Sequence, residues 1–192
     1  MNPERVKQLE GKLRDLRAAK ADLKPVLTDA LAKAADVQER AFILSQLASE
    51  WQLEIAKLPF SEKYKHKFDQ AERAIRECIA LEPNEPYHWI RLAEYFHVYA
   101  GDLEQATKAI DTAIKSAAKE RAFVRQAHGT RIRIALETKD YAAIEQSLAT
   151  LLEYIPPTGS PDVAMESDFL SGIPVGSVDP KLVERYRATV NQ

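Results

Sequence analysis

The sequence predicts an all-α protein, and two observations lead to this class. Glycine supplies only 6 of the 192 residues, whereas residues with high helix propensity (Ala, Leu, Glu, Lys, Arg and Gln) dominate from Pro3 to Tyr154. No clear alternation of apolar and polar residues, which a half-buried strand would require, occurs along the chain. The length suffices for one substantial core or for an elongated array of small ones.

Composition argues against several functional classes. A net charge of -2 speaks against binding to nucleic acid or to an anionic membrane surface. The opening segment MNPERVKQLEGKLRDLRAAK carries charges throughout, and no stretch approaches the roughly 18 consecutive apolar residues of a membrane span. The single cysteine, Cys78, excludes an internal disulfide bond and a multi-cysteine metal site. We therefore expect a cytoplasmic protein with no nucleic-acid or membrane partner.

The first segment, residues 1–40, has the pattern of a helical extension. Its apolar residues follow the intervals of three and four that form a heptad seam, with Lys20 at the one skipped position: Val6, Leu9, Leu13, Leu16, Leu23 and Leu27. Pro25 lacks an amide hydrogen and clashes with the preceding turn, so we expect a break or kink there. A second helix is expected over about residues 26–58, ended by Pro59, with Ser61 capping a third helix that runs to about Leu81.

A repeat becomes visible after this point. Three stretches align without gaps: FDQAERAIRECIALEP from Phe68, LEQATKAIDTAIKSAA from Leu103 and YAAIEQSLATLLEYIP from Tyr141. Their starts lie 35 and 38 residues apart, which is the spacing of a two-helix unit stacked along an axis. The first helix of the third unit is expected over about residues 120–137.

The best copy of this unit carries its characteristic residues at Trp89, Leu92, Ala93, Phe96, Gly101, Leu103, Ala106 and Ala113. This pattern resembles the tetratricopeptide repeat, over about residues 41–157. Ala118 replaces the closing proline of the family pattern, and one residue is inserted near Tyr99. The resemblance implies a right-handed α-solenoid of about three helix pairs. A helical bundle that shares the spacing by coincidence is the alternative.

Small residues inside the helical pattern have a physical explanation. Two helices approach to the lower end of the usual separation of about 8 to 10 Å only where the facing side chains are small. We therefore expect close helix contacts at Ala71, Ala93, Ala106 and Ala113. Cys78 occupies an alanine position and is expected to be a small buried hydrophobe, whereas large residues such as Trp89 and Phe96 fill the wider gaps.

Two sets of residues are candidates for partner binding. By the resemblance, the first helix of each pair lines a concave groove, which in the best copy would display Tyr87, Ile90, Glu94, His97 and Val98. A second candidate is basic: Arg121, Arg125 and His128 lie at i, i+4 and i+7 on one helix face and suit a carboxylate or a phosphate. The alternative for this row is a solvated face that pairs with the chain's own glutamates.

No catalytic or metal site is predicted. The four histidines, His66, His88, His97 and His128, lack metal-ligand spacing, and no glycine-rich phosphate loop appears. We therefore expect no enzyme activity, no metal and no cofactor.

The last segment, residues 158–192, changes in character. Phe169, Leu170, Ile173 and Val175 make it too apolar for a free linker, and Asp179 with Pro180 begins a final helix. We expect it to fold back as a cap on the last helix pair; a docking tail that orders on a partner is the competing interpretation. The whole chain is then a protein-interaction module or adaptor that binds a partner protein or peptide. The alternative is a helical-bundle subunit that forms a homodimer through the N-terminal seam.

Overall fold

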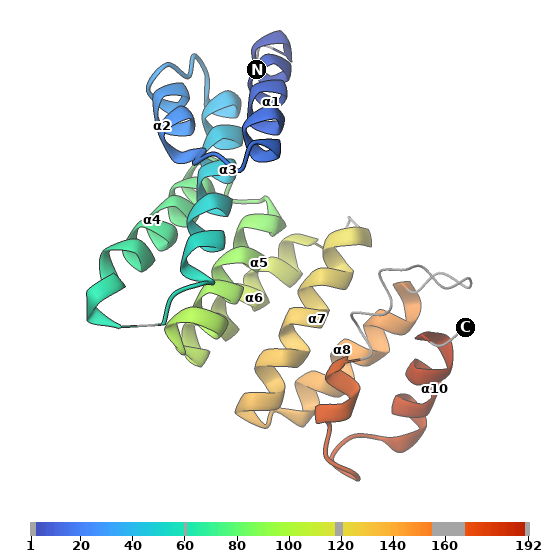
Figure 1. Ribbon diagram of the computed structural model, residues 1–192. Helices are drawn as coiled ribbons and strands as arrows, with labels where there is room; N and C mark the ends of the chain where they lie inside the picture. Colours follow the sequence, from blue (N-terminus) through green and yellow to red (C-terminus); the bar gives the residue numbers. More distant parts are fainter. Residues whose placement is uncertain (1–2, 60, 118–120, 155–167, 191–192) are drawn as a thin grey trace. The chain divides into compact units, whose positions relative to one another are not determined.

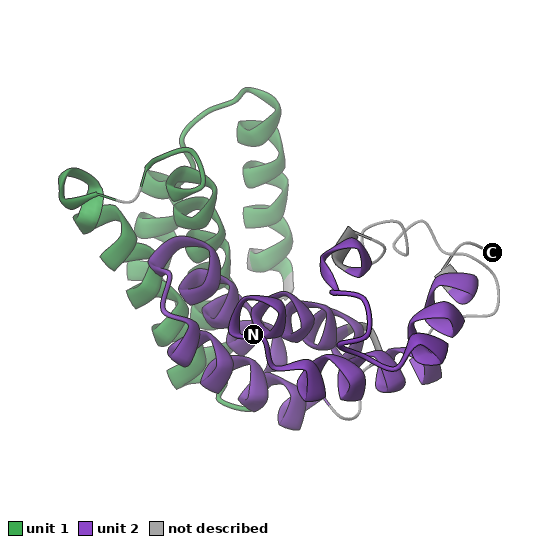
Figure 2. Ribbon diagram, turned by 90° about the horizontal axis from the view of Figure 1, so that it is seen from below, with its two compact units in different colours: residues 1–84 green, residues 85–192 purple. Residues whose placement is uncertain are grey.

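The computed structural model describes residues 3–59, 61–117, 121–154 and 168–190, and within these ranges every regular element is a helix (Figure 1). The chain divides into two compact units, residues 1–84 and 85–192, called unit 1 and unit 2 here (Figure 2). This boundary lies inside the expected repeat segment, residues 41–157, and differs from the expected divisions after residues 40 and 157.

Unit 1 contains four α-helices and a short 3-10 turn. The elements are α1 (Pro3–Ala18), α2 (Lys24–Ala32), α3 (Val37–Ile55), η1 (Glu62–Tyr64) and α4 (Lys65–Leu81). Helix α3 packs along α4 on one side and against α2 on another. The all-helical character predicted for this region is confirmed.

The helix expected over residues 26–58 is in fact two helices, α2 and α3, so that expectation was wrong. Asp36 starts α3, because its Oδ1 accepts a hydrogen bond from the Glu39 amide at 2.8 Å. Glu39 Oε2 in turn accepts from the Ala35 amide at 2.9 Å. This reciprocal arrangement is close to a capping box, and its D-x-x-E signature is visible in the sequence.

Pro25 and Ser61 lie at two of the predicted helix boundaries. The predicted break near Pro25 is confirmed, and Pro25 lies in the first turn of α2, where its missing amide hydrogen removes no helical hydrogen bond. Ser61 makes no side-chain cap, contrary to expectation. Instead the Tyr64 amide donates to the Ser61 carbonyl at 3.0 Å in the 3-10 turn, and α4 begins at Lys65 and ends at Leu81 as predicted.

The leucines of the N-terminal heptad pattern form one core cluster of unit 1. Leu13, Leu23 and Leu27 are buried together with Ile43 of α3, and Leu9 and Leu16 pack against this cluster. The apolar seam that a homodimer would need is therefore largely covered within the chain.

Unit 2 is a succession of helices that each pack on the next. Its elements are α5 (Pro86–Glu94), the π-helix η2 (Tyr95–Ala100), α6 (Leu103–Ala117), α7 (Arg121–Thr138), α8 (Tyr141–Tyr154), the 3-10 helix η4 (Asp168–Gly172) and α10 (Pro180–Val190). Helix α6 packs against both α5 and α7, α8 packs against α7, and α5 also reaches α7. The bounds of α7 agree with the predicted range of residues 120–137 to within one residue at each end.

The π-helix η2 contains Tyr99, near which the sequence has one residue more than the repeat pattern it resembles. A π turn takes up one more residue than an α turn. Gly101 then adopts a φ of 66°, and the Asp102 amide donates to the Phe96 carbonyl at 2.9 Å. Asp102 Oδ1 accepts from the Gln105 amide at 3.0 Å and so caps α6.

The expected close helix contacts fall at buried positions. Ala71, Ala93, Ala106 and Ala113 each have an exposed fraction of 0%. Cys78 is also fully buried, as expected of a small hydrophobe. Phe96 is buried, whereas Trp89 is only half-buried and therefore fills less of the core than expected.

The C-terminal segment packs on the last helix pair. One core cluster joins α7, α8 and the tail: Ile132, Ala135, Ala143, Ile144, Leu148, Leu151, Leu170, Val178 and Tyr186. Asp179 caps α10 by accepting from the Lys181 amide at 2.9 Å, and its own amide donates to Glu145 Oε1 at 2.8 Å. Val175 is fully exposed and takes no part in this packing, contrary to expectation, and the side chain of Phe169 lies outside the described residues.

Candidate functional site

One side of α7 meets α5 and η2 through polar and aromatic contacts. Its residues recur every three or four positions and therefore share one helix face: Phe123, Gln126, Thr130, Arg133 and Glu137. We call this surface, with the side chains of α5 and η2 that contact it, the α5–α7 face. The rings of Tyr87 and Phe123 lie 6.2 Å apart, and His97 Nε2 lies 2.8 Å from Glu137 Oε1.

Glu94 is the half-buried carboxylate of the α5–α7 face. Burial raises its pKa, and the positive charge of Arg133, the Thr130 hydroxyl and the charge of Arg91 oppose this rise. The Thr130 hydroxyl donates to Glu94 Oε1 at 3.4 Å. Burial, followed by the charge of Glu94, also raises the pKa of Tyr99 on η2. The Glu94 carboxyl group therefore interacts with groups of its own unit rather than with solvent.

The ring of Tyr87 contacts two side chains of its own helix, Arg91 and His88. The guanidinium carbon of Arg91 lies 5.4 Å from the centre of the Tyr87 ring, within the range of a cation–π contact. The His88 ring lies 6.2 Å away on its own helix. Arg91 itself is buried, so the aromatic face of Tyr87 supplies part of the environment that makes a buried guanidinium tolerable.

The groove residues predicted on α5 and η2 are not all available to a partner. Tyr87, Glu94 and His97 lie on the α5–α7 face and contact α7, and Val98 has an exposed fraction of 62%. Ile90 is fully buried, and its expected place in an exposed groove was wrong. It lies one turn from both Tyr87 and Glu94, so the packing of α5 against α7 that engages these two also covers the position between them.

The predicted basic row does not form as three cations. The side chain of Arg121 lies outside the described residues, and Arg125 is half-buried. His128 has an exposed fraction of only 6%. Burial, and secondly the charge of Arg131, lowers the pKa of His128 from the usual 6.5 to about 4. The imidazole is therefore neutral at pH 7, and the expectation that it contributes to an anion site was wrong.

A different basic arrangement on α7 escaped the sequence reasoning. Arg125, Gly129 and Arg133 recur at intervals of four and form one ridge of the helix, which we call the arginine–glycine ridge. Arg133 is exposed, whereas Gly129 is buried and lies in the interior of the helix. A Cβ at Gly129 would meet no heavy atom within 4 Å beyond its chain neighbours and its own helix backbone. The four-residue spacing was the available signal, although burial could not be read from it.

Glycine at position 129 is costly for the helix. A glycine in a helix interior destabilises it by roughly 0.5 to 1 kcal/mol relative to alanine. The open space around the position shows that no neighbouring side chain requires the missing Cβ. Nothing in the packing of unit 2 therefore explains why this residue is a glycine.

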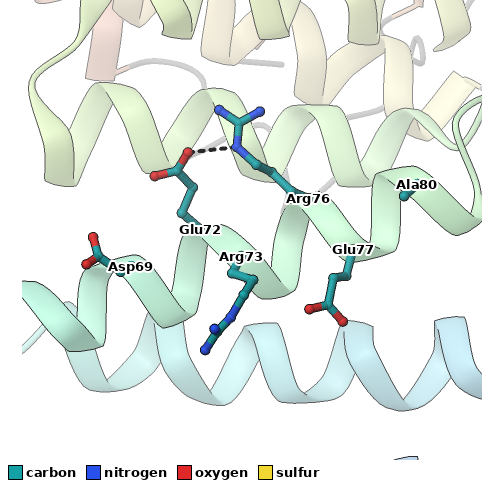
Figure 3. Close-up of a pocket in the computed structure, with 6 residues that line it drawn as sticks. All are labelled: Asp69, Glu72, Arg73, Arg76, Glu77 and Ala80. Atoms are coloured by element: carbon teal, nitrogen blue, oxygen red, sulfur yellow. Dashed lines mark hydrogen bonds and ion pairs between the residues drawn. The ribbon is translucent and has the colours of Figure 1, made fainter.

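Other polar surfaces have structural explanations. A shallow depression on α4 is lined by Asp69, Glu72, Arg73, Arg76, Glu77 and Ala80, all from this one helix (Figure 3). Glu72 Oε1 accepts from Arg76 Nε at 2.7 Å, an i, i+4 pair of the kind that stabilises an exposed helix face. With acids and arginines interspersed, the depression selects neither charge.

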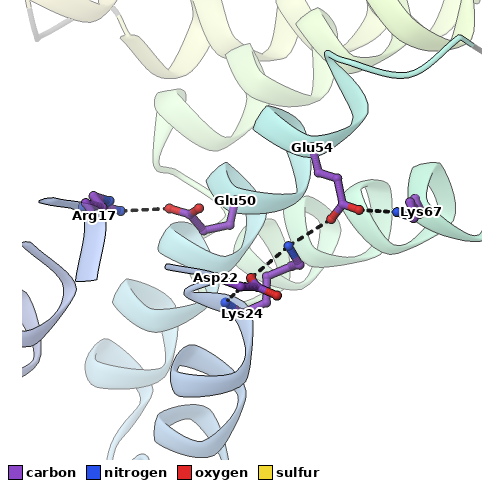
Figure 4. Close-up of polar contacts among 6 residues, drawn as sticks. All are labelled: Arg17, Asp22, Lys24, Glu50, Glu54 and Lys67. Carbon is purple, nitrogen blue, oxygen red and sulfur yellow. Dashed lines mark hydrogen bonds and ion pairs between the residues drawn. The ribbon is translucent and has the colours of Figure 1, made fainter. Parts of the chain in front are cut away.

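An ion-pair network joins the helices of unit 1 (Figure 4). Lys24 Nζ lies 2.9 Å from Glu54 Oε2 and 3.0 Å from Asp22 Oδ1, and Lys67 pairs with the other oxygen of Glu54. The bond from Lys67, and then that from Lys24, lowers the pKa of Glu54 against the effect of burial. These pairs fasten α2 and α4 to α3, and every charge in them already has an opposite charge beside it.

Neither a metal cluster nor a membrane helix appears in the part of the chain that the structure describes. Within it, no three His, Cys, Asp or Glu side chains gather closely enough to hold a metal ion. No described helix combines the length and the apolar character needed to cross a membrane. Comparisons with protein-family models, with curated proteins and with solved structures found no match to this chain.

His128 makes the stability of unit 2 depend on pH. The folded state keeps its pKa near 4 while the unfolded chain protonates near 6.5, so the contribution of the neutral imidazole is complete above pH 6.5 and is lost as the pH falls towards 4. We expect a loss on the order of 2 kcal/mol between about pH 7 and about pH 4 from this group. Urea denaturation at both pH values would measure it. His128→Gln should reduce the difference, whereas the exposed His66→Gln should not; an equal effect of both variants would contradict the assignment.

Proposed function

We propose that this chain is a non-catalytic protein-interaction module or adaptor of the tetratricopeptide-like kind. The proposed architecture is a right-handed α-solenoid of about three helix pairs, α3–α4, α5–α6 and α7–α8, with an N-terminal helical extension. The order of packing supports it, because each helix of a pair packs on its partner and α6 packs on α7. The 35- and 38-residue spacing of the aligned stretches supports it as well.

The observation that carries the proposal is the packing of α5 against α7. These are the first helices of two successive pairs, and in a stack of such pairs they line the surface used for binding extended peptides. The α5–α7 face presents Gln126 and Arg133 as exposed side chains beside the half-buried rings of Tyr87 and Phe123, and Val98, the neighbour of His97 on η2, is exposed as well. A surface with rigid aromatic residues and a few polar groups is typical of protein-binding sites.

Site-specific photocrosslinking in the native host tests the proposal. A benzoylphenylalanine at Val98, which is 62% exposed, should give discrete crosslinked species of protein partners. The same residue at Lys108, which is exposed on α6, serves as the matched control and should give none of these species. Identical crosslinking patterns from both positions, or none from either, would contradict binding through the α5–α7 face.

A further inference from the structure

We propose that the α5–α7 face recognises an extended partner peptide by two features: a large apolar side chain that packs on Tyr87 and Phe123, and a carboxylate four positions away that pairs with Arg133. This inference rests on the proposed function and names the chemistry of the partner. The α5–α7 face changes in character along its length. The two rings lie in the first turns of α5 and α7, whereas charged groups lie on η2 and in the last turns of α7.

The aromatic end of the α5–α7 face, Tyr87 with Phe123, suits an apolar anchor. The two ring centres lie 6.2 Å apart with their planes at 38°, and both side chains are half-buried, so each keeps part of its surface in solvent. Tyrosine and phenylalanine offer a large contact area with few rotatable bonds. An apolar side chain of a partner therefore packs on them at a low cost in conformational entropy.

Arg133 supplies a positive charge at the other end of the α5–α7 face. Its side chain is exposed, and it makes no ion pair or hydrogen bond with any residue that the structure describes. A guanidinium group binds a carboxylate through two parallel N–H donors, which gives direction as well as attraction. Arg133 can therefore bind the carboxylate of a partner without breaking a hydrogen bond of its own.

Two acids of the α5–α7 face, Glu94 and Glu137, interact with other groups. Burial raises the pKa of Glu94, and the charge of Arg133 and the Thr130 hydroxyl oppose the rise. The Thr130 hydroxyl donates to Glu94 Oε1 at 3.4 Å, and Glu137 Oε1 lies 2.8 Å from His97 Nε2. Neither acid forms an ion pair with Arg133, so the N–H donors of its guanidinium group remain for the carboxylate of a partner.

The distance between the two ends sets the spacing in the peptide. Phe123 and Arg133 are ten residues apart on α7, which at a rise of about 1.5 Å per residue places their backbones about 15 Å apart along the axis. In an extended peptide, positions i and i+4 lie about 13 Å apart and point to the same side. Gln126, exposed between the two ends, offers an amide to the peptide backbone. A large apolar residue and an acid at this spacing form the motif that we expect in the partner.

Selection from a phage-displayed library of random dodecapeptides on the full-length protein tests the motif. Selected clones should share a large apolar residue and an Asp or Glu four positions apart. Selection on Arg133→Gln should keep the apolar preference and lose the acidic one, because this substitution removes only the guanidinium group. Arg185→Gln, at an exposed arginine of α10, is the control and should select the same motif as the wild type.

Fluorescence anisotropy with a fluorescein-labelled synthetic copy of the most frequent selected peptide measures the contribution of each end. Arg133→Gln should weaken binding about tenfold, since a hydrogen bond to a charged group is worth that order of affinity. Phe123→Leu, which keeps an apolar side chain at a half-buried position, should weaken binding several-fold. Replacing the acid of the peptide by its amide should weaken binding to the wild type and leave binding to Arg133→Gln unchanged.

Three results would overturn the proposal: no enriched peptide, an enriched motif without the acid, or an acidic preference that survives Arg133→Gln. Any of these, together with the crosslinking at Val98 described above, would refute this inference alone and leave the proposed function standing. Absence of that crosslinking would instead contradict the proposed function itself.

Discussion

Replacing Tyr186 by alanine should lower the free energy of unfolding of unit 2 by about 3 to 5 kcal/mol. Tyr186 is the largest side chain of α10 that is fully buried, and it packs in the cluster that contains Leu148 and Leu151 of α8. Removing its ring leaves a hole that surrounding helices fill only in part. Urea denaturation followed by fluorescence measures the loss.

The chain permits this measurement to be confined to one unit. Its two tryptophans are Trp51 on α3 in unit 1 and Trp89 on α5 in unit 2, so a Trp51→Phe background leaves Trp89 as the reporter of unit 2. Arg185→Ala, at the exposed neighbouring position, is the control and should change the midpoint little. If Tyr186→Ala behaves like this control, α10 is not part of the core of unit 2.

Truncation after Pro157 extends the same argument to the whole tail. Leu170, Val178 and Tyr186 leave the core cluster together in that variant, so the last helix pair should lose stability and tend to aggregate. A truncated protein that stays as stable as the full chain would favour a docking tail over a cap.

Local sequence signals predicted most of the helix boundaries because those signals act within a few residues. Pro25 marked the start of α2, and Asp179 and Pro180 marked the start of α10. The break between α2 and α3 was missed although Asp36 and Glu39 carry its signature. There the alanines and leucines on both sides concealed the cap, since they favour helix equally well.

The exposure of the candidate site residues was less predictable, because burial depends on the neighbouring helix. The resemblance implied a groove position for Tyr87, Ile90 and Glu94, but only the packing of α5 against α7 decides that Ile90 is covered. In the same way, His128 has the spacing of a basic row, whereas burial makes it neutral. Periodicity gives the direction of a side chain from its helix, and a second helix determines whether solvent or protein lies in that direction.

The small residues of the repeat pattern should be intolerant of growth, and Ala106→Leu tests this. Ala106 is fully buried in α6, which packs against both α5 and α7, so three added carbon atoms must displace one of these helices or adopt a strained rotamer. We expect a loss of roughly 1 to 3 kcal/mol in the free energy of unfolding of unit 2, again followed by Trp89 fluorescence.

Ala142→Leu provides the matched control, because the same substitution at this exposed position of α8 adds the same atoms without a neighbour to displace. Leucine and alanine differ little in helix propensity, so this variant should keep the wild-type midpoint to within about 0.5 kcal/mol. If Ala106→Leu is as stable as Ala142→Leu, then α6 does not make its closest approach to α5 or α7 at Ala106. The role assigned to alanine in the repeat pattern would then fail at the position where the aligned copy is best preserved.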